Sequence, residues 1–173
     1  DNGEFSISMR YYPTADNNGW RRLWMADIEG MTNNLSDGFG NFGMYGNPSS
    51  KQVNKKLCLI YMNGDSRSNI EIPNGFIKNK WHHLVINMKP NNEPIIYLNG
   101  ELVNYSYFSS NKDLYLSTNL AGKKLTGAKV RAGTKSNYLK SGAITFGNLT
   151  EIHYNKRQFK GYVSSYHVFN KQL

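Results

Sequence analysis

The feature that most constrains the fold of this chain is a two-residue turn between two apolar segments. Residues 95–98 and 101–103 flank Asn99-Gly100, a dipeptide that accepts the positive φ angles of a type I′ turn. Such a turn holds the two arms of a hairpin in one register. Residues 81–88, just before it, read as an alternating strand. We therefore predict a strand that leads into a tight hairpin.

Alternation along 81–88 separates the side chains onto two faces of that strand. One face carries Trp81, His83, Val85 and Asn87, and the other carries His82, Leu84, Ile86 and Met88. Adjacent histidines in a strand point in opposite directions, so His82 and His83 cannot hold one metal ion together. We predict that both are structural and that their imidazoles anchor turns through hydrogen bonds.

The composition favours strands over helices throughout the chain. Aromatic residues make up 13% of the 173 residues, with 12 Tyr and 16 Gly, and there is no Ala- or Leu-rich helical window. A chain of this length buries roughly 70% of the surface that its unfolded form exposes, so one core is feasible. We predict an all-β fold in a single domain over residues 1–173.

Further short strands and turn signals recur along the sequence, as in a sandwich or barrel. The turns are expected at Asn63-Gly64-Asp65 and Pro73-Asn74-Gly75. The predicted strands are 5–12, closed by Pro13, then 20–29, 39–45, 57–62, 144–148, 151–154 and 162–169. We interpret the irregular region 111–141 as an excursion from the sheets, with short strands at 114–116 and 128–131.

Four motifs together resemble the laminin G-like, or concanavalin A-like lectin and glucanase, superfamily. In order they are Phe5-Ser6-Ile7-Ser8, Trp81-His82-His83-Leu84, Tyr97-Leu98-Asn99-Gly100 and the segment 161–170. They cover nearly the whole chain. The resemblance implies two curved antiparallel sheets packed as a jelly-roll sandwich, in an extracellular glycan-binding protein.

The chain departs from that pattern at two places. An acidic pair expected in the last strand is replaced by Ser164 and Ser165. Since Ca²⁺ needs six to eight oxygen ligands, several of them carboxylates, a structural calcium ion there lacks its usual ligands, and we predict no metal and no cofactor. Only residues 1–4 precede the first motif, where relatives carry another strand, so a neighbouring domain or subunit could pair with that sheet edge.

The sequence argues against hydrolysis. Superfamily glucanases use a Glu-x-Asp-x-Glu strand, and the nearest match is Met25-Ala26-Asp27-Ile28-Glu29. Asp27 and Glu29 match the last two positions, but Met25 stands in the place of the nucleophile. A thioether cannot form the glycosyl ester of a retaining mechanism. We predict no enzyme, with a glycoside hydrolase as the least favoured function.

The net charge indicates which partners to expect, and the cysteine content indicates which disulfides are possible. The formal net charge is +9, and residues 114–150 contain no Asp or Glu. This basic stretch has two interpretations, attraction to an acidic polymer or a solvated face. Basic and aromatic residues also interleave here, but without a nucleic-acid-binding signature we do not expect nucleic acid. The single Cys58 excludes an internal disulfide and lies in an apolar run, which predicts a buried thiol.

We therefore predict a non-catalytic carbohydrate-binding or adhesion module that could favour acidic glycans; the alternative is a protein-interaction or assembly domain in a multidomain chain. No apolar run approaches the roughly 20 residues of a membrane span. The chain begins at Asp1, so we expect a domain excised from a larger secreted or cell-surface protein. The predicted ligand-binding residues are Arg10, Trp20, Arg22, Asp27, Tyr45, Asn63, Lys129 and Arg131.

Overall fold

The structure is a computed structural model, and it describes residues 4–15, 22–28, 42–46, 55–63, 66–89, 92–107, 125–127, 145–146 and 159–173. These residues contain twelve strands and no helix. The strands are β1 Phe5–Pro13, β2 Arg22–Ile28, β3 Phe42–Gly46, β4 Leu57–Asn63, β5 Ser66–Ile72, β6 His82–Met88, β7 Ile95–Leu98, β8 Glu101–Leu102, β9 Ser106–Tyr107, β10 Leu125–Gly127, β11 Thr145–Phe146 and β12 Gly161–Phe169.

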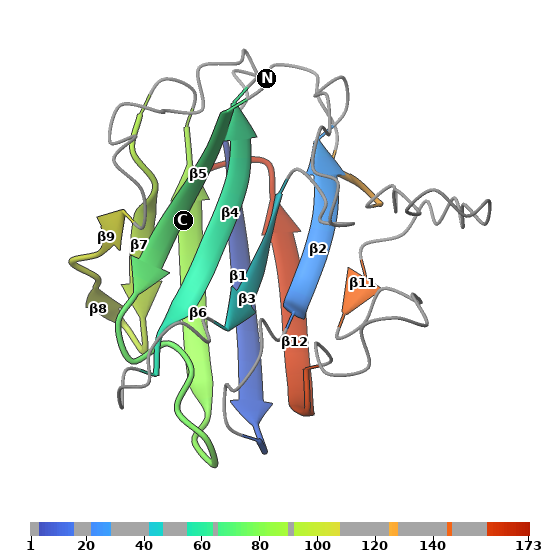
Figure 1. Cartoon of the computed structure of the whole chain (residues 1–173). Helices are drawn as coiled ribbons and strands as arrows, with labels where there is room; N and C mark the ends of the chain where they lie inside the picture. The colour runs from blue at the N-terminus through green and yellow to red at the C-terminus, as the bar shows by residue number, and fades with distance from the viewer. Residues whose placement is uncertain are drawn as a thin grey trace.

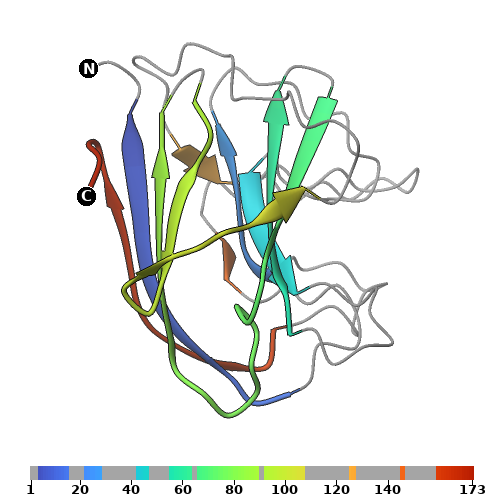
Figure 2. The ribbon, with the colours of Figure 1, turned by 90° about the vertical axis from the view of Figure 1, so that its left-hand side faces the viewer.

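The strands form two antiparallel sheets that lie face to face (Figures 1 and 2). One has five strands in the order β12-β1-β6-β7-β8. The other has seven, in the order β10-β2-β3-β4-β5-β9, with β11 also paired to β2. This confirms the predicted all-β, two-sheet antiparallel sandwich.

The hairpin has the predicted geometry. Asn99 has a φ of 55° and Gly100 a φ of 87°, while Leu98 pairs with Glu101 and Tyr97 with Leu102. A second contact fixes the turn, because the backbone N–H of His83 donates to Oδ1 of Asn99 at 2.9 Å. The turn is thus held to β6 as well as by its own backbone.

The core lies between the sheets and confirms the predicted alternation of β6. His82, Leu84, Ile86 and Met88 are buried, whereas His83 and Val85 are partly exposed. Asn87, on the same face as His83, departs from this pattern: it is buried and its amide donates to the carbonyl of Leu173. The other buried apolar side chains are Ile7, Met9, Tyr11, Leu23, Trp24, Met44, Leu57, Leu59, Ile70, Ile72, Phe76 and Ile96. Cys58 is buried too, as predicted.

A β-bulge overturns the simple alternation expected along 162–169. In the pairing of β1 with β12, Arg10 faces Ser165 but Tyr11 faces Val163, so one residue of β12 is extra. The bulge reverses which residues point inward, and both Val163 and Tyr166 consequently pack against the core.

Other elements differ from the prediction in extent. β5 was not predicted, because Ser, Arg and Asn interrupt its apolar pattern, yet it pairs with β4 along its whole length. Within the region 111–141, β10 pairs with Ile28, Asp27 and Ala26 of β2, so the expectation of an excursion is wrong for residues 125–127. The strands predicted at 114–116, 128–131 and 151–154 lie outside the described residues.

Candidate functional site

Of the predicted ligand-binding residues, Arg10 is the one whose side chain the structure describes. It is exposed on β1, between the buried residues Met9 and Tyr11. Because those neighbours point into the core, Arg10 points to the outer face of the five-stranded sheet. We call the surface of the five-stranded sheet that faces away from the seven-stranded sheet the outer face.

An aromatic row crosses one end of the outer face. It consists of Tyr162, Tyr12 and Trp81, which lie on β12, on β1 and just before β6. The ring centroids of Tyr12 and Trp81 are 5.4 Å apart, and those of Tyr12 and Tyr162 are 6.1 Å apart. Trp81 is 48% exposed and Tyr162 is 64% exposed. Exposed large aromatic side chains are a feature of binding surfaces, so this row, with its two outer rings open to solvent, is a candidate binding surface.

A polar row lies beside the aromatic row, and its residue on β1 is two positions before Tyr12. Arg10 pairs with His83 on one side and Ser165 on the other. Nε2 of His83 is within hydrogen-bond distance of Oγ of Ser8, at 3.0 Å, which fixes the imidazole against β1. The outer face therefore offers flat aromatic surface next to a guanidinium group and hydroxyl and imidazole groups.

This arrangement suits a sugar chemically. Aromatic rings present apolar faces that pack against the C–H groups of a pyranose ring. A guanidinium group can form two parallel hydrogen bonds with a carboxylate. None of Tyr12, Trp81 and Tyr162 was predicted as a ligand-binding residue. Alternation along the sequence places Trp81 and His83 on the same face of one strand. The pairing of β1 with β6 and β12 is needed to bring the three rings together.

The other predicted residues belong to the seven-stranded sheet or lie outside the described residues. Arg22 and Tyr45 are brought together as partners in the pairing of β2 with β3. Asp27 pairs with Thr126 near the other end of β2, and Asn63 with Ser66 at the end of β4. Trp20, Lys129 and Arg131 lie outside the described residues. Arg10 belongs to the five-stranded sheet and so to a different surface.

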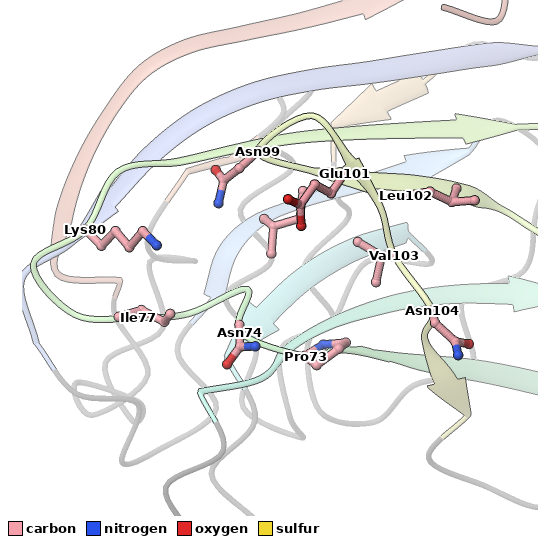
Figure 3. Close-up of a pocket in the computed structure, with 10 residues that line it drawn as sticks. Pro73, Asn74, Ile77, Lys80, Asn99, Glu101, Leu102, Val103 and Asn104 are labelled. Carbon is pink, nitrogen blue, oxygen red and sulfur yellow. The ribbon is translucent and has the colours of Figure 1, made fainter.

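A pocket of about 530 Å³ opens between the loop after β5 and the β7–β8 hairpin (Figure 3). The chain crosses here from one sheet to the other, because β8 belongs to the five-stranded sheet and β9 to the seven-stranded sheet. The pocket is lined by Pro73, Asn74, Ile77, Lys80, Leu98, Asn99, Glu101, Leu102, Val103 and Asn104.

His82 fixes the loop that forms one wall of this pocket. Nε2 of His82 lies 3.1 Å from both the backbone N and the carbonyl oxygen of Ile77, within hydrogen-bond distance of each, which confirms the predicted role of this imidazole in anchoring a turn. Burial lowers the pKa of His82, a hydrogen bond with the backbone of Ile77 raises it, and the charge of Lys80 lowers it. The ring of His83 contacts Ser8 in a strand and does not anchor a turn.

Among the described residues, no three His, Cys, Asp or Glu side chains gather as metal ligands. No helix in that part of the chain has the length and hydrophobicity to cross a membrane.

A family model described as the concanavalin A-like lectin/glucanases superfamily matches residues 1–173. The chain belongs to this superfamily. The match agrees with the resemblance inferred from the four motifs and with the two-sheet fold. A sequence comparison with the curated proteins gives no match for this superfamily member.

Three solved structures align with this chain at low identity, and the first of them supports the fold. The carbohydrate-binding module CBM40 of the Ruminococcus gnavus IT-sialidase, bound to α2,3-sialyllactose, aligns with a TM-score of 0.57 and 14% identity over 98% of this chain and 77% of that one. A heptameric SAP-like pentraxin from Limulus polyphemus gives 0.49 and 12%, covering 98% and 65% of the two chains. Mouse laminin α1 domains LG4-5 give 0.43 and 16%, covering 95% and 34%.

Proposed function

We propose that this lectin/glucanase-superfamily domain is a non-catalytic carbohydrate-binding or adhesion module of a secreted or cell-surface protein. We further propose that it binds an acidic glycan on the outer face of its five-stranded sheet. The observation that carries the proposal is the row of Tyr162, Tyr12 and Trp81, whose two outer rings are exposed, with Arg10 beside it. Sugar rings pack on the aromatic row, and an acidic group on the glycan binds Arg10.

The charges of the outer face favour an anion over a cation. Arg10 places a guanidinium charge on this face, His83 and His167 add imidazole hydrogen-bonding groups, and β1, β6 and β12 contain no carboxylate. The likeness to a module bound to sialyllactose supports the choice of an acidic glycan as the first probe. Met25, which replaces the nucleophile expected of a glucanase, supports a binding role without hydrolysis.

A calorimetric titration with α2,3-sialyllactose, and with lactose as the uncharged control, tests the proposal. We expect sialyllactose to bind more tightly than lactose. Trp81→Ala and Tyr162→Ala should each weaken binding by about 1 kcal/mol, or roughly fivefold. Ile95→Ala is the matched control, because Ile95 is 40% exposed on the same sheet but lies away from the aromatic row. If neither the trisaccharide nor lactose binds the folded domain, the outer face is not the site for these glycans. Equal losses in Ile95→Ala would contradict the role of the row.

A second candidate function, assembly with another protein, is favoured by one observation. Ile95 and Leu102 are 40% and 68% exposed at the β7–β8 side of the five-stranded sheet. Apolar side chains exposed at the edge of a sheet are candidate contacts for another chain. Light scattering over a range of protein concentrations tests self-association, which Leu102→Lys should abolish. A mass that stays at one chain throughout would remove self-assembly as the explanation for these residues.

A further inference from the structure

The pocket between the loop 73–80 and the β7–β8 hairpin has walls that are fixed from several directions. On the loop side, the N–H of Phe76 donates to the carbonyl of Lys55 and the N–H of Asn79 to the carbonyl of Pro13, both at 2.8 Å. The hydroxyl of Tyr11 donates to the carbonyl of Gly75 in the same loop. Such a loop loses little conformational freedom when a ligand binds, and this favours affinity.

The hairpin wall is fixed in the same way. The N–H of Asn99 donates to the carbonyl of His83 at 2.7 Å, and the N–H of Val103 donates to the carbonyl of Ile96 at 2.8 Å. Oδ1 of Asn99 accepts from the N–H of His83, so its amide NH₂ is the group left for the pocket. The turn therefore presents a donor whose orientation is set before any ligand arrives.

Two opposite charges belong to this one pocket. Lys80 extends into it from the loop, and Glu101 extends into it from the hairpin (Figure 3). Among the described residues, no ion pair joins them to each other or to another side chain. A ligand with a net charge would be attracted by one group and repelled by the other, which favours an uncharged ligand.

The remaining lining alternates between polar and apolar groups. The amides of Asn74 and Asn104 supply both donors and acceptors, the amide NH₂ of Asn99 supplies donors, and the carboxylate of Glu101 supplies acceptors. The apolar part comes from aliphatic side chains, namely Ile77, Leu98, Leu102 and Val103. Neighbouring hydroxyl groups on a sugar are donors and acceptors at once, and the ring carries C–H groups between them.

We propose that this pocket is a second carbohydrate site, which takes one uncharged sugar ring through neighbouring hydroxyl groups. Its volume falls within the range of about 300–1,000 Å³ that is usual for small-ligand sites. The site differs from the aromatic row in its lining and in the charge of its ligand. The proposal for this pocket does not depend on the binding of an acidic glycan to the outer face.

The test is an NMR titration of the domain, recording backbone amide shifts, with the methyl glycosides of glucose, galactose, mannose and N-acetylglucosamine. At least one glycoside should give saturable shifts at residues 73–80 and 98–104. Because the pocket carries both charges and the ligand none, the affinity should change little with salt. The absence of saturable shifts around the pocket with all four glycosides would overturn the proposal, and so would an affinity that collapses in high salt.

Two asparagines in the loop provide a matched pair of variants. Asn74 and Asn79 both have a φ of 57°, a conformation that glycine adopts without strain. Only Asn74 lines the pocket. Asn74→Gly should therefore weaken binding of the glycoside about fivefold or more, whereas Asn79→Gly should leave it unchanged. Equal losses in the two variants would contradict a direct contact with the ligand.

One further variant separates the two sites. Tyr162→Ala removes an exposed ring of the aromatic row and does not touch the pocket lining. It should reduce binding of sialyllactose and keep the shifts that the glycoside causes at residues 73–80. Loss of both activities in this variant would contradict two independent sites.

Discussion

The hydroxyl of Tyr11 donates a hydrogen bond to the carbonyl oxygen of Gly75, which joins β1 to the loop after β5. The Tyr11 ring is fully buried and stacks on the ring of His82, with centroids 5.1 Å apart. Burial raises the pKa of Tyr11 far above its usual range, so the phenol stays protonated and remains a donor. One buried hydroxyl thus supports the loop that forms a wall of the pocket.

Tyr11→Phe should lower the free energy of unfolding by about 1–2 kcal/mol, because it leaves the buried carbonyl of Gly75 without this donor. Urea denaturation measures the change. Tyr12→Phe is the control, since Tyr12 lies on the outer face and its substitution should cost less than about 0.5 kcal/mol. Equal losses in the two variants would show that the hydrogen bond to Gly75 contributes nothing specific.

Gly161 should be intolerant of any side chain. A Cβ atom there would lie 2.1 Å from the carbonyl oxygen of Tyr12 and 2.7 Å from the Phe159 ring. The backbone of β1 cannot move away without breaking its pairing with β12, so Gly161→Ala should cost about 2–4 kcal/mol.

Gly100→Ala is the comparison for that substitution. Gly100 has a φ of 87°, but no atom lies within 4 Å of the position that a Cβ would take, so only backbone strain of about 1 kcal/mol is expected. Thermal unfolding of both variants would rank the two costs. A Gly161→Ala protein as stable as Gly100→Ala would contradict the close approach of β12 to β1.

His82 should make the domain less stable in mild acid. Burial lowers its pKa below the ordinary value of 6.5, so as the pH falls through 6.5 the unfolded chain takes up a proton and the folded chain resists. The contribution to stability is complete above pH 6.5 and is lost progressively as the pH falls toward the folded pKa.

Urea denaturation at about pH 7.5 and about pH 5.5 would measure this loss. His82→Gln should show a smaller decrease in stability between the two conditions, although it starts from a lower value because the contact with Ile77 changes. His83→Gln is the control and should keep the decrease of the unchanged protein. An undiminished decrease in His82→Gln would exclude His82 as its source.

The sequence was sufficient for the fold because its strongest signals are local. The dipeptide Asn99-Gly100 predicts its own turn, and the apolar alternation of β6 predicts most of its buried residues. The aromatic row is not a local feature, since Tyr12, Trp81 and Tyr162 come together only through the register of three strands. The bulge opposite Tyr11 also changes which residues of β12 face outward, and no sequence pattern in 161–169 predicts it.

Arg10 was predicted because it is a charged residue on the polar side of an alternating strand, a pattern that period two makes visible. Its neighbours His83 and Ser165 could not be predicted, because strand pairing depends on the whole sandwich. The pocket was missed for a related reason: its two walls are turns, and the sequence does not state that these turns meet.

Arg10 should make the binding of acidic glycans depend on salt. Raising the salt from about 0.1 M to about 1 M shortens the Debye length from about 10 Å to about 3 Å, which weakens an exposed pair between a guanidinium and a carboxylate. The affinity for α2,3-sialyllactose should fall roughly threefold to fivefold, since such a pair contributes at most about 1 kcal/mol.

Two variants test whether Arg10 is the source of this salt dependence. Arg10→Met should bind as weakly in low salt as the unchanged domain binds in high salt. Lys55→Met removes an exposed lysine from another part of the surface and should behave as the unchanged domain. If Arg10→Met keeps the full salt dependence, the acidic group of the glycan contacts a different cation, and the orientation proposed on the outer face is wrong.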